Sequence, residues 1–105
     1  MHLHLTSRHF EITPKIEKLI EQKITEKIEP LISHFAPEFH TASLHLEQQS
    51  HDKEYYARFD MILPPKVRLF AKSHHRLLSS ALVDLSHEIR SQITKVKASQ
   101  VNYSL

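Results

Sequence analysis

Ten histidines stand out among the residues of this sequence that are able to do chemistry. His2 and His4 lie two apart in a segment with strand-like alternation, so their rings are expected on one face. A histidine metal site needs three or four converging ligands, and no HExxH-type spacing is present. The pattern therefore predicts scattered surface histidines, with no metal site and no other cofactor.

The chain contains no cysteine and no glycine. The absence of cysteine excludes disulfides, thiolate metal sites and cysteine nucleophiles. The absence of glycine excludes glycine-rich phosphate loops and the GxSxG nucleophile elbow. No pair of carboxylates is marked by its spacing for acid–base catalysis. The sequence therefore predicts a protein that is not an enzyme and has no catalytic residues.

The basic residues are informative by position rather than by number, because the formal net charge is only +2. Several of them flank the apolar stripes of two predicted helices. Packed side by side, two such helices could merge their basic residues into one surface that meets phosphates. An equally supported alternative is a solvated face with charges paired at i,i+4 spacing. The predicted RNA-binding residues are Arg8, Lys23, Lys27, Arg76, Arg90, Lys95 and Lys97.

Periodicity predicts the elements that position these residues. Residues 2–6 alternate as a half-buried strand. Thr13, directly before a proline, marks a helix start as its N-cap. Apolar residues at spacings of three and four over 16–35 predict an amphipathic helix. Pro30 is expected to kink or shorten the last turns of this helix, and Pro37 to end it.

Three further alternating segments, residues 42–46, 55–63 and 67–72, predict strands. The element order is then β-α-β-β-β-α, which defines an α+β fold. We expect a four-stranded sheet with two helices packed on one face and the other face open to solvent. The first β-α-β step predicts that the first two strands are parallel, and short hairpins join the rest.

The last helix is expected to begin after Ser73 as N-cap, with His74–His75 in its opening turn. Its apolar stripe extends over residues 77–96. We therefore predict a single domain over residues 1–99 and a flexible tail over 100–105. No apolar run approaches the roughly 20 residues needed to cross a bilayer. No secretory signal is visible either, so a cytoplasmic protein is expected.

The opening pattern of the chain resembles that of the ribosome hibernation-promoting factors, also called ribosome-associated inhibitors or sigma-54 modulation proteins. This opening pattern is Leu3-x-Leu5-Thr6-x-Arg8-His9-x-Glu11-Ile12-Thr13. The last helix resembles the closing segment of the same family through Ala81-Leu82, Leu85, Ile89, Gln92-Ile93 and Lys95-x-Lys97. The likeness extends over roughly residues 2–97 and includes the order of the elements.

The resemblance implies a domain that binds small-subunit ribosomal RNA in the decoding channel. There it blocks messenger and transfer RNA and stores ribosomes in an inactive state during stress or stationary phase. The implied partner is the small ribosomal subunit, with no membrane and no small-molecule substrate, and the chain looks like a short form of the family. The basic positions that carry over are Arg8, Lys23, Lys27, Lys95 and Lys97.

The sequence also departs from the family pattern. Glu88, Ser91 and Thr94 stand where the basic face of the family's last helix usually continues. Ser7 replaces a frequent glycine, and 74–76 (His-His-Arg) replaces a usually acidic helix start. Each lost phosphate contact is expected to weaken binding and to flatten its salt dependence.

Two alternatives accompany this hypothesis. A domain that kept the fold but lost ribosome binding would be a protein-interaction module. Its mark would be an exposed apolar patch around Tyr56, Ile62 and Phe70 on the open sheet face. A histidine-based pH switch would instead strengthen phosphate attraction in acid, because unperturbed histidines titrate near about pH 6.5.

Overall fold

The computed structural model describes the backbone of residues 1–103 and the side chains of residues 1–98. The predicted order β-α-β-β-β-α and the α+β fold class are confirmed, with the first helix divided in three. The elements are β1 (His2–Arg8), α1 (Pro14–Ile20), the π-helical turn η1 (Glu21–Thr25), α2 (Glu26–Ile32), the 3₁₀ turn η2 (Pro37–Phe39), β2 (Thr41–Gln48), β3 (Tyr55–Leu63), β4 (Val67–His75) and α3 (Leu78–Tyr103).

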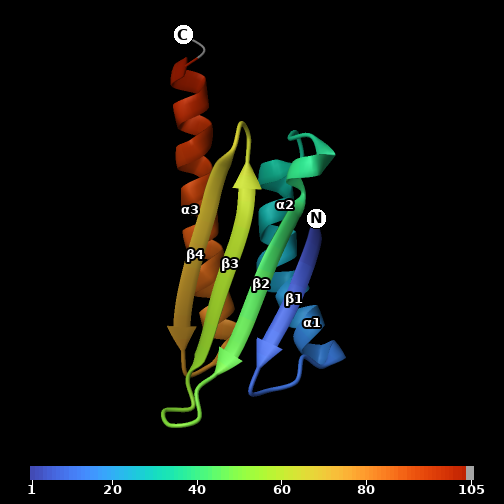
Figure 1. Cartoon of the computed structure of the whole chain (residues 1–105), viewed down its shortest axis with the longest axis vertical. Helices are drawn as coiled ribbons and strands as arrows, with labels where there is room; N and C mark the ends of the chain where they lie inside the picture. Colours follow the sequence, from blue (N-terminus) through green and yellow to red (C-terminus); the bar gives the residue numbers. More distant parts are fainter. Residues whose placement is uncertain (104–105) are drawn as a thin grey trace.

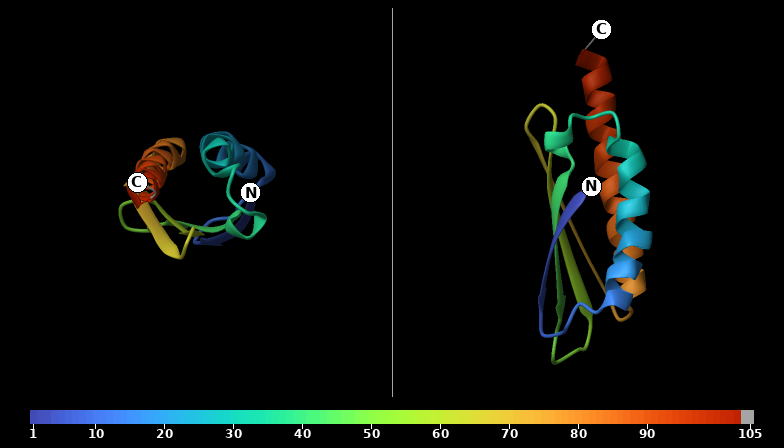
Figure 2. Two further views of the ribbon diagram at one scale, coloured as in Figure 1. Left: turned by 90° about the horizontal axis from the view of Figure 1, so that it is seen from above. Right: turned by 90° about the vertical axis from the view of Figure 1, so that its right-hand side faces the viewer.

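The four strands form one sheet in the order β1-β2-β3-β4. β1 and β2 are parallel, as the β-α-β connection predicts, whereas β3 is antiparallel to both of its neighbours. The helical segments lie side by side on one face of the sheet, and the other face is open (Figures 1 and 2). The strand register decides which side chains are neighbours on that open face.

The first helical segment begins where the sequence predicts and ends earlier than predicted. Thr13 is the N-cap, as predicted, and its Oγ1 accepts a hydrogen bond from the Ile16 N–H at 3.3 Å. The segment ends at Ile32, shortly after Pro30 and before the end of the apolar stripe. Pro30 lies inside α2, where its missing N–H removes one helical hydrogen bond, and its predicted kinking or shortening of the helix stays a prediction. Contrary to the prediction, Pro37 does not end the helix but begins the 3₁₀ turn η2.

The π-helical turn η1 helps one long apolar stripe to stay on the sheet. Four isoleucines spaced by four residues are buried along this segment: Ile20, Ile24, Ile28 and Ile32. With about 3.6 residues per α-helical turn, a four-residue spacing drifts around the helix by about 40° per step. In η1 the Glu26 N–H bonds to the Glu21 carbonyl, five residues back. This wider turn takes more residues and therefore offsets part of the drift.

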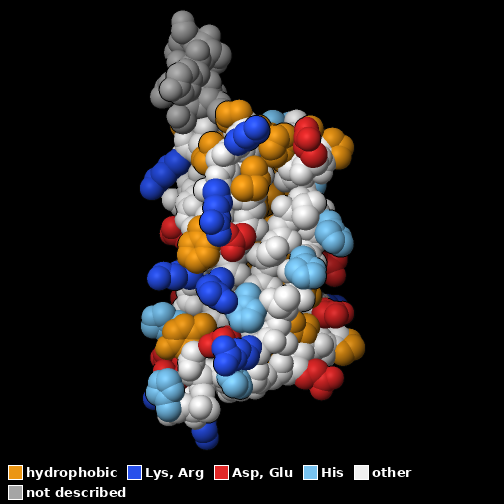
Figure 3. Space-filling model, viewed as in Figure 1, with side chains coloured by type: hydrophobic (Ala, Val, Ile, Leu, Met, Phe, Trp, Pro, Cys, Tyr) orange, Lys and Arg blue, Asp and Glu red, His pale blue; other side chains and the backbone are white. Residues whose placement is uncertain are grey.

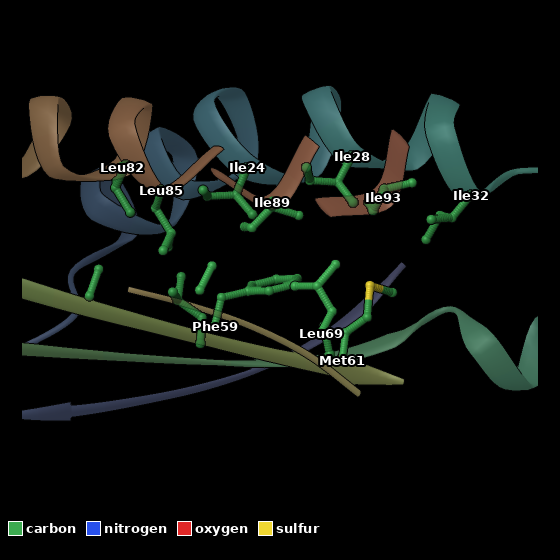
Figure 4. Close-up of a cluster of buried hydrophobic side chains, with 14 of the residues drawn as sticks. Ile24, Ile28, Ile32, Phe59, Met61, Leu69, Leu82, Leu85, Ile89 and Ile93 are labelled. Atoms are coloured by element: carbon green, nitrogen blue, oxygen red, sulfur yellow. The ribbon is translucent and has the colours of Figure 1, made fainter. Parts of the chain in front are cut away.

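The core lies between the helices and the sheet (Figure 4). Isoleucines and leucines of α2 and α3 point toward side chains of β3 and β4. Phe59, on the inner strand β3, is the largest of the fully buried side chains. The predicted facing of β3 is confirmed, because Ala57, Phe59 and Met61 are buried while Arg58 between them is exposed.

The start of the last helix differs from the prediction. β4 continues to His75 because Ser73, His74 and His75 pair with the first three residues of β3. Ser73 is therefore not an N-cap, and the two histidines are strand residues rather than helix residues. The Ser73 hydroxyl instead donates to the Ala81 carbonyl of α3 at 2.6 Å. The hairpin ladder with β3 thus outweighs the local capping signal.

The backbone of α3 continues to Tyr103, into the segment that the sequence analysis treated as a tail. Residues 104–105 lie outside the described residues. The division of the chain into a domain over 1–99 and a flexible tail over 100–105 therefore stays a prediction.

Candidate nucleic-acid interface

The two helical segments leave a groove between them. One hollow of about 480 Å³ separates α2 from α3 and is lined by Leu31, His87, Arg90, Ser91, Thr94 and Lys95. A second, of about 270 Å³, lies between η1 and the first turns of α3, where Lys23 and Asp84 are among its lining residues. We call these two hollows together the helix groove.

Three of the predicted RNA-binding residues line this groove, and a fourth lies on the first helical segment beside it. Lys23, Arg90 and Lys95 line it directly. Lys27 is exposed and lies four residues from both Lys23 and Leu31, which puts it on the stripe between the two hollows. None of the four forms an ion pair with a carboxylate among residues 1–98. The structure thus brings basic residues of both helices together, while their role in RNA binding stays a prediction.

The other predicted residues lie outside the groove. Lys97 is partly buried, and its ammonium nitrogen lies 5.7 Å from the centroid of the Phe35 ring, so it covers one end of the core. Arg76 is exposed in the turn before α3. Arg8 ends β1 and lines a hollow on the open sheet face, across the sheet from the helices. The predicted set is therefore divided between two faces of the molecule.

The alternative of a solvated helix face with paired charges required ion pairs within the helices. The ion pairs of the described residues join the N-terminus to Glu29, Arg68 to Asp60, and three histidines to nearby carboxylates. None of them joins two residues of one helix. The lysines of the helix groove are therefore free of the partners that this alternative assigned to them.

The departures from the family pattern separate into two kinds. Glu88 accepts a hydrogen bond from the Gln92 side chain at 2.9 Å, and the same amide donates to the Phe70 carbonyl of β4 at 2.8 Å. This carboxylate therefore helps to hold α3 against the edge strand. Ser91 and Thr94, in contrast, line the helix groove and leave it with fewer charges than two basic residues would supply.

Several histidines have polar partners instead of being scattered freely over the surface. His45 Nδ1 lies 2.7 Å from the Thr6 hydroxyl, and His40 Nε2 lies 2.8 Å from the Ile32 carbonyl. Among the residues that the structure describes, no group of three or more potential metal ligands occurs. Within the same part of the chain, no helix is both long and apolar enough to cross a membrane.

Comparison with known proteins gives one family and a shared fold. The model of the family described as "Sigma 54 modulation protein / S30EA ribosomal protein" matches residues 3–100. A ribosomal subunit interface protein from Coxiella burnetii is 19% identical, with a TM-score of 0.71, over 93% of this chain and 99% of that one. The N-terminal domain of Protein Y from Thermus thermophilus is 18% identical, with a TM-score of 0.71, over 91% and 99%. No curated protein matches the sequence.

The two solved structures share the α+β fold of this chain, with helices on one face of a four-stranded sheet. Because the family model matches nearly the whole chain, the protein belongs to the Sigma 54 modulation protein / S30EA ribosomal protein family. This is a family of ribosome-associated factors and not an enzyme family. The resemblance noted from the sequence is confirmed.

Proposed function

We propose that this protein binds small-subunit ribosomal RNA in the decoding channel and keeps messenger and transfer RNA out. It acts in the cytoplasm during stress or stationary phase, when ribosomes are stored in an inactive state. The mechanism is steric occlusion, so it needs no catalytic group and no reading of RNA sequence. The long, narrow body, with extents of 51 × 23 × 19 Å, suits insertion into a channel.

The observation that carries this proposal is the row of cations in the helix groove. Lys23, Arg90 and Lys95 line the groove from both helical segments, and Lys27 is exposed on α2 four residues after Lys23. None of the four has a carboxylate partner among the described residues. Free ammonium and guanidinium groups on one surface are what a phosphate backbone attracts. Membership of the Sigma 54 modulation protein / S30EA ribosomal protein family supports ribosomal RNA as the partner.

The direct test is sedimentation of the protein with purified small subunits through sucrose gradients at several salt concentrations. Four phosphate contacts predict a slope of about −3 for log K against log salt, or roughly a 50-fold loss of affinity between 50 and 200 mM. Subunits already filled with messenger and transfer RNA should take up less protein. Binding that ignores salt, or that is unaffected by the two RNAs, would contradict the proposal.

The protein-interaction alternative receives less support from the geometry. Ile62 and Phe70 are 47% and 42% exposed and lie near each other on the open sheet face. Tyr56 lies six residues along β3 from Ile62, or about 20 Å, and stacks on His74. Arg68 covers part of Phe70, with its guanidinium 6.0 Å from the ring centroid. The three apolar residues therefore do not form one patch.

Restoring a basic residue to the helix groove should strengthen binding. We expect Ser91→Lys to raise affinity for small subunits by roughly tenfold and to steepen the salt slope by about 0.7 to 0.9, because it adds one phosphate contact. The matched control is Ser50→Lys, which adds the same charge to the exposed loop between β2 and β3. Equal gains from both variants, measured by co-sedimentation, would mean that net charge matters and the groove does not.

A further inference from the structure

The open face of the sheet carries a second basic surface, separate from the helix groove. A hollow of about 530 Å³ lies over residues of all four strands, within the usual range of about 300 to 1,000 Å³ for ligand sites. Figure 3 shows this face, with Lys and Arg side chains gathered on the side of β3 and β4. We call this hollow the sheet site; its lining includes Arg8, Arg58 and Lys72 and the rings of His45, Tyr56 and His74.

Two cations of the sheet site lie directly opposite each other on neighbouring strands. Arg58 and Lys72 are register partners on β3 and β4, and both side chains are exposed. Like charges directly opposite each other on neighbouring strands repel. On the same face Arg68 is paired with Asp60 at 2.7 Å, whereas neither Arg58 nor Lys72 has an ion pair or side-chain hydrogen bond among the described residues. An anion bound between the two would remove this repulsion.

The residues that line the sheet site carry more positive than negative charge. Arg8 supplies a third cation, and Glu47 is the carboxylate in the described lining. Glu47 Oε2 accepts a 2.6 Å hydrogen bond from the Gln49 amide, and its Oε1 lies 3.6 Å from His45 Nε2. Both oxygens of the Glu47 carboxylate therefore already have partners, His45 on the same strand and Gln49 just after it. Among the described residues, three cations and one anion therefore line the hollow itself, while two further carboxylates, Asp52 and Glu54, contact its aromatic end.

An aromatic surface adjoins these cations. Tyr56 and His74 are register partners whose rings stack, with centroids 5.4 Å apart and planes inclined by 23°. The tyrosine hydroxyl donates to Asp52 at 3.4 Å, and the Glu54 carboxylate lies 3.3 Å from His74 Nδ1. Partial burial, with the charges of Asp52 and Glu54, raises the pKa of the Tyr56 phenol. The phenol therefore stays uncharged and does not repel a phosphate.

We infer that the sheet site binds single-stranded RNA, with a phosphate between Arg58 and Lys72 and a base against the Tyr56–His74 stack. Tyr56 and Arg58 are two residues apart on one strand, about 7 Å, which is close to the reach of one nucleotide from base to phosphate. Basic side chains beside stacking rings are the combination that unpaired RNA uses. An acidic peptide would satisfy the cations but would leave the rings unused.

The test measures fluorescence anisotropy of a short labelled oligoadenylate with the full chain at low salt. Arg58→Gln/Lys72→Gln should lower affinity by about tenfold or more, because two phosphate-binding charges are lost. It should melt no lower than the parent protein, because the change also removes a repulsion. Lys18→Gln/Lys66→Gln removes the same charge at exposed positions outside the sheet site and should keep affinity within about twofold.

Two further arms separate RNA from other anions. Tyr56→Leu should weaken oligoadenylate binding by about tenfold, since one stacked base is lost. Oligoglutamate of similar charge should compete poorly. Unchanged oligoadenylate affinity in Arg58→Gln/Lys72→Gln or in Tyr56→Leu, or equal binding of oligoglutamate, would overturn the inference.

The inference stands apart from ribosome binding through the helix groove. Arg90→Glu/Lys95→Glu should keep oligoadenylate binding while it loses the small subunit. If that variant loses the oligoadenylate and Arg58→Gln/Lys72→Gln does not, the RNA site is the groove, and the sheet site is wrong while the proposed function survives. If the parent protein does not bind the small subunit but still binds the oligoadenylate, the proposed function is wrong while the sheet site survives.

Discussion

Replacing Arg90 and Lys95 with glutamate is expected to lower affinity for small ribosomal subunits by on the order of 100-fold. Both side chains line the helix groove and lack carboxylate partners among the described residues. The double variant removes two phosphate contacts and puts two negative charges in their place. The slope of log K against log salt should therefore become shallower by about 1.4 to 1.8, measured by co-sedimentation over a salt series.

The control for this variant is Lys18→Glu/Lys66→Glu. It makes the same change in net charge at two exposed positions, one on α1 and one in the turn between β3 and β4. We expect it to bind subunits within about threefold of the parent protein, since only long-range attraction is altered. An equal loss in both double variants would show that net charge decides binding. An unchanged affinity in Arg90→Glu/Lys95→Glu would remove the groove from the interface.

The overall fold could be predicted because burial imposes a period on each element. The alternation of buried Ala57, Phe59 and Met61 with exposed Arg58 identifies β3, and the predicted bounds of that strand agree with the structure. The apolar stripe of the first helix is equally regular. The end of β4 could not be found this way, because it depends on pairing with a strand nearly twenty residues earlier. A serine before a helix gave a local signal that this distant pairing overrode.

The candidate site was predictable in part. The spacing of Lys23 and Lys27 was enough to put both beside the apolar stripe, and helix packing then brought them toward Arg90 and Lys95. The continuation of β1 to Arg8, beyond the predicted strand over 2–6, could not be read in this way, because it depends on pairing with β2. These are consequences of three-dimensional packing with no counterpart in local residue patterns.

The sheet site was missed for a related reason. Alternation along β3 and β4 put Arg58 and Lys72 on the open face, and that much was visible in the sequence. That the two are direct neighbours depends on the register of the hairpin, which the turn between the strands sets. The contact between Lys97 and Phe35 is similarly invisible, because the ring belongs to a connection after α2. Strand register and the paths of the connecting segments therefore decide which side chains become neighbours, and periodicity does not predict either.

Replacing Phe59 with alanine is expected to destabilise the domain by about 3 to 5 kcal/mol. This ring is fully buried between the inner strand and both helical segments, where its loss leaves a cavity that the surrounding side chains fill only in part. A domain of this size has roughly 5 to 15 kcal/mol of stability in total. The midpoint of thermal unfolding, followed by circular dichroism, should fall by on the order of 15 to 30 °C.

The matched control is Phe70→Ala, which makes the same substitution on the neighbouring strand but on the open face. Phe70 is 42% exposed and loses mainly its contact with the Arg68 guanidinium, so its cost should stay below about 1 kcal/mol. The difference between the two variants mainly reports burial, because residue type and lost volume are alike. Equal shifts in the unfolding midpoint would contradict the assignment of the helix-covered face as the core. A larger effect of Phe70→Ala would mean that the face described as open is covered in solution, for example by a second copy of the chain.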